Sequence, residues 1–131
     1  MKFTIPGEPT GKGRPRVTKW GTHTPEKTVL YENLVKTCFN GEVLQGELEM
    51  NVVAYYQIAK SASKKQRELM MNLVIRPTKK PDCDNVLKII ADALNGIAYQ
   101  DDSQIVRASI EKRYSDVPRV EVEVKEWEET K

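Results

Sequence analysis

The segment between residues 84 and 95 constrains the fold most, because its apolar residues recur at the spacing of an α-helix. Asp84, Lys88 and Asp92 recur at steps of four and therefore share the opposite face. Gly96 follows Asn95 and is a natural stop signal. We predict a helix from Asp84 to Asn95. Its apolar face, at steps of three and four, continues just past that end: Val86, Ile89, Ile90, Ala93, Leu94 and Ile97.

An acidic pair stands at each end of this predicted helix. Asp82 and Asp84 lie at its amino end, where a carboxylate can accept hydrogen bonds from free backbone N–H groups. Asp101 and Asp102 come after a short connection and precede residues 104–110, a predicted strand. One helix with tight connections can bring the two pairs together.

Converging carboxylates suit a hard divalent cation, since Mg²⁺ prefers carboxylate oxygens and retains several waters. Lys88 lies one turn into the helix and can contact phosphate or stabilise charge on a leaving oxygen. Any one of these Asp residues alone is more often a helix cap or a turn residue. The four together, with lysines on both sides, favour a metal site that handles phosphate.

Three short motifs stand in this part of the chain. Residues 80–88 read Lys-Pro-Asp-Cys-Asp-Asn-Val-Leu-Lys, residues 92–96 read Asp-Ala-Leu-Asn-Gly, and residues 101–104 read Asp-Asp-Ser-Gln. Their order and spacing resemble the RusA family of Holliday junction resolvases, whose pattern is roughly K-P-D-x-D-N-x-x-K, D-A-L-N-G and D-D-x-Q. Cys83 occupies a variable position. Weaker similarity extends over most of the chain, at residues 6–7, 12–16 and 112–114.

This resemblance implies a small, homodimeric, Mg²⁺-dependent endonuclease that nicks four-way DNA junctions, of a kind common in phage and prophage genomes. It implies that Asp82, Asp84 and Asp102 are the metal ligands and catalytic carboxylates, and that Lys88 is the essential lysine. Asp101 is a further candidate ligand or an outer-shell orienter. The sequence is compatible with one or two ions per subunit and with Mn²⁺ in place of Mg²⁺. No nucleotide cofactor is expected.

Basic residues predict where DNA binds. The formal net charge is only +2, but residues 121–131 carry −3, which leaves +5 on residues 1–120. Arg14-Pro15-Arg16 holds two guanidinium groups on a stiff segment, which suits contact with phosphates; a solvated basic loop is the alternative. The proline-bracketed segment 76–81 adds further charge beside the acidic pair. The predicted DNA-binding residues are Lys12, Arg14, Arg16, Arg76, Lys79 and Lys80.

The rest of the chain predicts an α+β fold. The segregated order of elements favours a two-layer, RusA-like arrangement, with helices packed on one face of a mixed, mainly antiparallel sheet. Thr24 and Ser63 are the predicted caps of the first two helices, and the last strand is placed near an edge. The length predicts a single domain, residues 1–131. Strands are expected at 2–5, 17–19, 47–59, 105–114 and 120–127, and helices at 24–39 and 63–71.

Composition excludes several classes of protein. Cys38, Cys83 and the lone His23 are too few for a zinc site, so the cysteines are expected to be free thiols. No apolar run has the length of a transmembrane segment or a signal peptide. We therefore expect a cytoplasmic protein with no membrane partner.

The leading hypothesis is metal-dependent resolution of four-way junctions by paired phosphodiester hydrolysis. A phosphatase with an aspartyl nucleophile also uses Asp-x-Asp, but there the motif follows an apolar strand, whereas here Lys79-Lys80-Pro81 precedes it. A nucleotide-sugar transferase needs a donor-binding domain for which 131 residues leave little room. A non-catalytic DNA-binding module would explain the basic residues but not the acidic ones.

Overall fold

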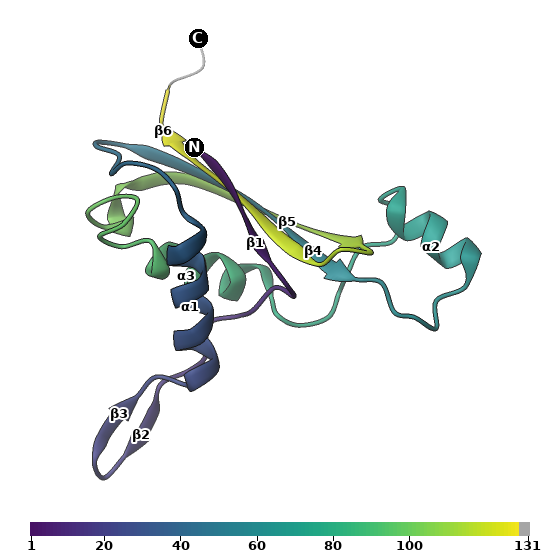
Figure 1. Ribbon diagram of the computed structural model, residues 1–131, viewed down its shortest axis with the longest axis horizontal. Helices are drawn as coiled ribbons and strands as arrows, with labels where there is room; N and C mark the ends of the chain where they lie inside the picture. Colours follow the sequence, from purple (N-terminus) through teal and green to yellow (C-terminus); the bar gives the residue numbers. More distant parts are fainter. Residues whose placement is uncertain (129–131) are drawn as a thin grey trace.

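One mixed sheet forms the centre of the molecule (Figure 1). The structure is a computed structural model and describes residues 1–128, except for the side chain of Arg16. The strand order is β1 (Lys2–Pro6), β6 (Arg119–Glu126), β4 (Leu48–Gln57) and β5 (Ile105–Ser115). The pairs β1–β6 and β6–β4 are antiparallel, and β4–β5 is parallel. This confirms the predicted mixed, mainly antiparallel sheet.

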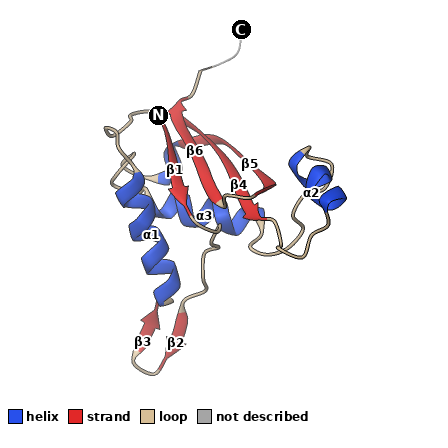
Figure 2. Ribbon diagram, turned by 45° about the vertical axis from the view of Figure 1, so that its right-hand side comes forward, coloured by secondary structure: helices blue, strands red, loops and turns tan. Residues whose placement is uncertain are grey.

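Two helices, α1 (Glu26–Cys38) and α3 (Cys83–Ala93), cover one face of the sheet (Figure 2). The residues of β4 alternate between buried and half-buried along the whole strand, as expected when only one face is covered. Val120, Val122 and Val124 of β6 are buried on the helical side. The α+β class and the packing of helices on one face are therefore confirmed.

The third helix, α2 (Lys64–Met71), lies beyond the end of the sheet and buries none of its residues (Figure 1). Its predicted start is confirmed, because Ser63 and Gln66 form a capping box. An ion pair of 2.6 Å between Arg67 Nη1 and Asp116 Oδ1 links α2 to the turn between β5 and β6. None of the described helices is both long and apolar enough to cross a membrane.

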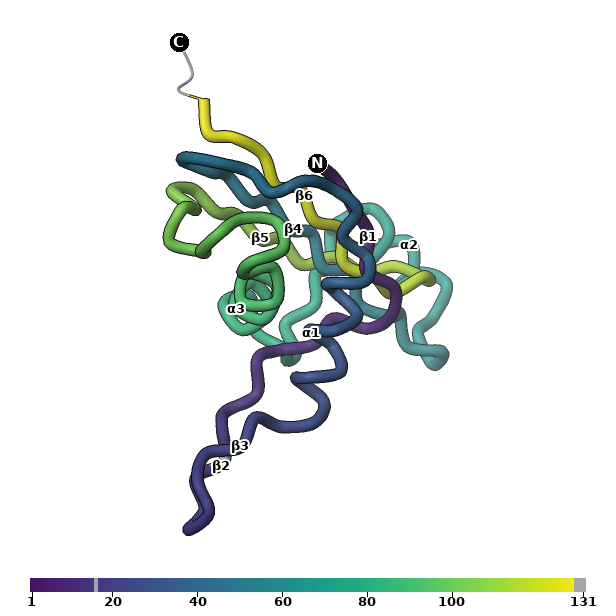
Figure 3. The backbone as a smooth tube through the Cα atoms, turned by 60° about the vertical axis from the view of Figure 1, so that its left-hand side comes forward, coloured from purple at the N-terminus to yellow at the C-terminus, as the bar shows by residue number. Residues whose placement is uncertain are grey.

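A separate hairpin of β2 (Arg16–Thr18) and β3 (Gly21–His23) projects beyond the amino end of α1 (Figures 1 and 3). The segment before it packs closely against the body. A Cβ on Gly13 would lie 2.6 Å from Thr28 Oγ1, and one on Gly11 would lie 2.9 Å from the Cβ of Pro81. Both distances are shorter than side-chain contacts allow, so these glycines permit the close approach.

Three local predictions are corrected. The last strand, β6, is not near an edge but lies between β1 and β4. Its alternating valines define which face is buried, but not which strands lie on either side. Thr24 does not cap α1: Pro25 takes the N-cap position and makes no side-chain cap bond. Helix α3 ends at Ala93 rather than Asn95, and Leu94 is its C-cap residue.

Candidate active site

The first acidic pair lies at the start of α3. Asp82 is the N-cap residue, yet its carboxylate accepts no capping hydrogen bond. The buried Tyr56 hydroxyl donates a 2.5 Å hydrogen bond to the carbonyl of Pro81 and so fixes the backbone just before Asp82. Burial also raises the pKa of Tyr56 to about 12, so its hydroxyl stays protonated at neutral pH. The carboxylate of Asp82 is exposed and available to a ligand.

Asp84, Lys88 and Asp102 line one cavity of about 310 Å³. Asp84 and Lys88 lie one turn apart on α3, and Asp102 reaches the cavity from the first residue of a short 3₁₀ turn, η1 (Asp102–Gln104). The other side chains lining the cavity are apolar: Met50, Leu87, Ala91, Ile105 and Ala108. The structure thus brings together two predicted ligands and the predicted lysine, from the amino-terminal half of α3 and from η1.

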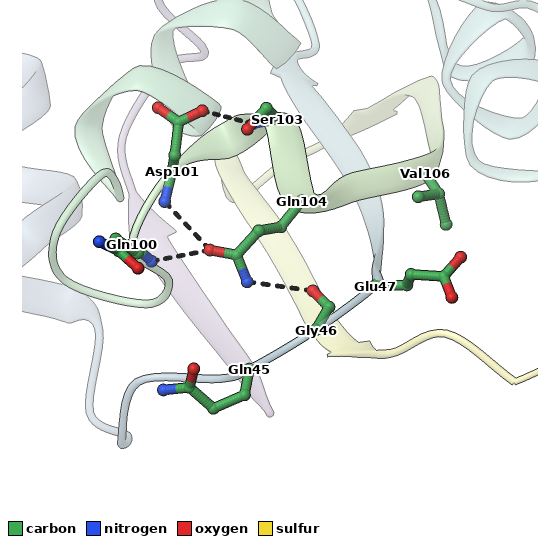
Figure 4. A pocket seen from close by; sticks show the side chains of 8 residues that line it. All are labelled: Gln45, Gly46, Glu47, Gln100, Asp101, Ser103, Gln104 and Val106. Carbon is green, nitrogen blue, oxygen red and sulfur yellow. Dashed lines mark hydrogen bonds between the residues drawn. The ribbon is translucent and has the colours of Figure 1, made fainter.

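Hydrogen bonds of two amide side chains hold the turn that carries Asp102. The backbone N–H of Asp102 donates to Asn95 Oδ1 over 2.8 Å. Gln104 Oε1 accepts from the N–H groups of Gln100 and Asp101 at 3.0 and 3.1 Å, and Gln104 Nε2 donates to the carbonyl of Gly46 at 3.0 Å (Figure 4). The position of Asp102 therefore depends on Asn95, before the turn, and on Gln104, at its end.

Asp101 does not line the Asp84–Lys88–Asp102 cavity. Its carboxylate accepts a 3.1 Å hydrogen bond from the N–H of Ser103, and hydrogen bonds from Ser103 lower the pKa of Asp101. It lines a separate pocket of about 560 Å³ with Gln45, Glu47 and Gln100, among others (Figure 4). In this arrangement Asp101 shapes the turn.

A network of charges connects α1, α3 and the N-terminal segment. Lys12 Nζ lies 2.8 Å from Glu32 Oε2 and 3.2 Å from Asp92 Oδ2. Burial lowers the pKa of Lys12, but the hydrogen bonds to Glu32 and Asp92 outweigh it and the net shift is upward. Lys88 Nζ lies 4.0 Å from the same Asp92 oxygen. Lys12, predicted to contact DNA, is thus paired with two carboxylates of the protein.

The pKa of Asp102 is raised. Burial is the main cause, followed by the charge of Asp101 and by the carboxylate of Asp92; Lys88 acts in the opposite direction. Asp102 therefore faces more negative charge than Lys88 offsets. A divalent cation bound at the cavity would relieve this repulsion.

The carboxylates at the cavity fit a Mg²⁺ ion that is bound by only a few protein ligands. Within residues 1–128 no three His, Cys, Asp or Glu side chains converge on one point. Mg²⁺ sites in phosphate-handling enzymes commonly use one or two carboxylates together with waters and substrate phosphates. Asp84 and Asp102 supply two carboxylates at the cavity, and Asp82 lies outside its lining, at the helix start.

The predicted DNA-binding residues lie in different surroundings. Arg14, Lys79 and Lys80 are exposed, and the side chain of Arg16 lies outside the described part. Arg76 pairs with Glu111 Oε1 at 2.6 Å and also donates to the carbonyl of Lys112. Residues 79–80 directly precede the first acidic pair.

Sequence reasoning missed the positioning roles of three residues. Asn95 was assigned only to the end of the helix, Gln104 only to the start of a strand, and Glu32 had no role. For Asn95 and Gln104 a signal was present, because both stand inside the short motifs at 92–96 and 101–104. Nothing in the sequence marks Glu32 as a partner of Lys12.

Comparison with known proteins defines the family. A family model described as Endodeoxyribonuclease RusA matches residues 6–125, and the chain therefore belongs to this endodeoxyribonuclease family, which confirms the resemblance in its motifs. Uncharacterized protein YqaN of Bacillus subtilis (strain 168) is 38% identical over 136 residues, with 96% of each chain covered. The crossover junction endodeoxyribonuclease rusA of Lactococcus phage r1t is 32% identical over 101 residues, which cover 76% of this chain and 68% of that protein.

Proposed function

We propose that this chain is a Mg²⁺-dependent endonuclease that resolves four-way DNA junctions by phosphodiester hydrolysis, acting as a homodimer in the cytoplasm. The observation that carries the proposal is the cavity shared by Asp84, Lys88 and Asp102 in a chain of the RusA family. The Lactococcus phage relative is a crossover junction endodeoxyribonuclease, which supports a DNA junction as the substrate.

Asp84 and Asp102 would hold the ion at the cavity, and Asp82 would add a further carboxylate from the start of α3. A bound Mg²⁺ would acidify a water and neutralise the negative charge that develops on the phosphate oxygens. The side chain of Lys88 is 62% exposed, so its ammonium group is free to leave Asp92. In the mechanism it contacts the nonbridging or leaving oxygen of the phosphate. Asn95 and Gln104 keep Asp102 facing the cavity.

Basic side chains position the DNA. Carboxylates alone repel a phosphate backbone, so a nuclease needs cations beside its acidic site. Arg14, Lys79 and Lys80 are exposed and serve this purpose. A four-way junction is close to two-fold symmetric, and a two-fold dimer presents one cavity to each of two strands.

The test is a cleavage assay with the pure protein and an end-labelled four-way junction, with a linear duplex of the same arm sequence as control. We expect paired nicks in the junction with Mg²⁺ and none with a chelator. Junction binding without cleavage in any divalent ion would favour the non-catalytic module. Hydrolysis of a small phosphomonoester with no nicking would favour the phosphatase.

A further inference from the structure

The β2–β3 hairpin exposes two large apolar side chains. Val17 is 83% and Trp20 is 81% exposed, the highest values among the large apolar residues in the described part of the chain. Every described side chain of the hairpin is exposed, and the hairpin projects away from the helices and the sheet (Figure 3). Most of the Trp20 ring is therefore left uncovered by the described chain.

The tip of the hairpin is nevertheless well defined. Thr18 Oγ1 donates to the carbonyl of Gly21 over 3.1 Å and accepts from the N–H of Trp20 over 3.2 Å. Gly21 has a φ of +122°, which a residue with a side chain rarely adopts. An isolated two-stranded hairpin is only marginally stable in water. A binding partner that covers Trp20 would therefore also stabilise the hairpin.

Charge identifies the class of that partner. Residues 9–25 contain four basic residues and no acidic one. Lys12 is used within the protein, but Arg14 and Lys19 form no ion pair within residues 1–128. Lys19 Nζ lies 5.2 Å from the centre of the Trp20 ring. An aromatic ring flanked by cations is a typical surface for stacking on nucleobases.

The base of the hairpin is anchored beside the candidate active site. The N–H of Lys12 donates to the carbonyl of Asn85 over 3.1 Å, in the first turn of α3. Gly11 packs against Pro81, next to Asp82. The segment that leads into the hairpin therefore packs against the start of α3, where Asp82 and Asp84 lie.

We propose that the hairpin is a DNA-binding arm and that Trp20 stacks on a nucleobase exposed where duplex arms meet. In a continuous duplex both faces of an internal base pair are covered by its neighbours, whereas a branch point exposes faces to solvent. Trp20 then contributes to the recognition of branched over linear DNA. This inference rests on the proposed function in taking DNA as the ligand.

The direct test uses Trp127→Phe, which leaves Trp20 as the only tryptophan of the chain. Tryptophan fluorescence is followed while a four-way junction, or a linear duplex as control, is added in a metal-free buffer. We expect the junction to quench Trp20 and shield it from acrylamide, with a much smaller effect of the duplex. The matched variant Trp20→Phe, which reports only Trp127, is expected to show no change.

A second measurement separates stacking from charge. Trp20→Ala is expected to weaken junction affinity about tenfold, with an unchanged salt dependence, because stacking releases no counterions. Trp20→Phe is expected to restore most of the affinity. Arg14→Ala is expected to reduce the slope of affinity against salt instead.

Three outcomes would overturn the inference. In the first, Trp20 fluorescence does not change when DNA is added, and in the second it changes equally with duplex and junction. In the third, Trp20 is shielded from acrylamide without DNA, to an extent that depends on protein concentration. The last would assign the hairpin to contacts between copies of the chain. Since the assay needs no metal, its result is independent of cleavage. If the protein nicks junctions but Trp20 fluorescence does not change, only the DNA-binding role of the hairpin is rejected. If Trp20 fluorescence changes but the protein does not nick junctions, only the proposed catalysis is rejected.

Discussion

Asp101 and Asp102 are neighbours in sequence but differ in what surrounds their carboxylates. Asp102 lines the cavity with Asp84 and Lys88, whereas Asp101 accepts a hydrogen bond from Ser103 and faces another pocket. The difference comes from η1, which turns consecutive side chains to different sides.

The first prediction uses this contrast. We expect the single-turnover nicking rate to fall at least about a hundredfold in each of three variants, because an amide is a weaker ligand for Mg²⁺ than a carboxylate. These variants are Asp82→Asn, Asp84→Asn and Asp102→Asn. Asp101→Asn should cost much less. Junction affinity is expected to hold or tighten, since less negative charge faces the phosphates. Near-normal nicking by one of the three would remove that residue from the ligand set.

The second prediction concerns Lys88, whose ammonium group lies 4.0 Å from Asp92 on the same helix face. An exposed ion pair at this spacing stabilises a protein by only about 0.3–0.5 kcal/mol. A cation acting on transition-state charge is worth about 3–4 kcal/mol. Lys88→Met should therefore lower the nicking rate roughly a hundredfold or more, while the melting temperature and junction affinity stay close to wild type. A variant that unfolds, or cleaves within a few fold of wild type, would make Lys88 structural.

At the scale of elements, the segment around Lys12 connects three parts of the fold. Lys12 lies between Glu32 of α1 and Asp92 of α3, and its backbone binds to Asn85. Gly13 donates to the buried Thr28 hydroxyl over 3.0 Å, which fixes the segment to α1. The charged side chain of Lys12 therefore holds the two helices together beside the cavity.

The third prediction tests this role. Lys12→Met leaves the partly buried carboxylate of Glu32 without its cation and leaves Asp92 with only the more distant, exposed Lys88. We therefore expect the free energy of unfolding to fall by about 1–3 kcal/mol, with Lys36→Met, on the exposed face of α1, as the control. The folded-state pKa of Lys12 is raised, so this stabilisation is present at neutral pH and is lost only as the pH rises past 10.5 toward the folded pKa. Denaturant unfolding at pH 7 measures the loss. Equal stability of the two variants would return Lys12 to the DNA-binding set.

The elements also show how far the sequence could predict the structure. Periodicity located every described helix and the four strands of the main sheet within a few residues, because this signal is local. The predicted cap was right for α2 and wrong for α1. The place of β6 between β1 and β4 is a non-local property that its alternating valines do not encode. Similarly, the acidic motifs pointed to residues of which Asp84, Lys88 and Asp102 line one cavity. They do not show that Asp101 lines a different pocket, which depends on η1 and Gln104.

At the scale of the whole molecule, paired cleavage needs two cavities. One chain contains one Asp84–Lys88–Asp102 cavity, whereas resolution of a junction requires two nicks in opposed strands. A two-fold dimer meets this requirement with a single kind of interface.

The fourth prediction follows from this requirement. We expect light scattering to give twice the chain mass at assay concentrations. Mixed dimers of wild type and Asp102→Asn should produce nicked junctions that are not resolved, because only one strand is cut. Full resolution by a protein that stays monomeric would contradict the dimer, and full resolution by mixed dimers would show that one cavity cuts both strands.

The central position of β6 also has a consequence for biosynthesis. This strand follows every other described helix and strand in the chain, yet it is the one that joins β1 to β4 and buries Val120, Val122 and Val124. A nascent chain that has not reached residue 119 cannot close the sheet against α1 and α3. An interrupted translation product would therefore carry the whole acidic site without the scaffold that shapes it. We therefore expect such a fragment to be unable to cleave DNA.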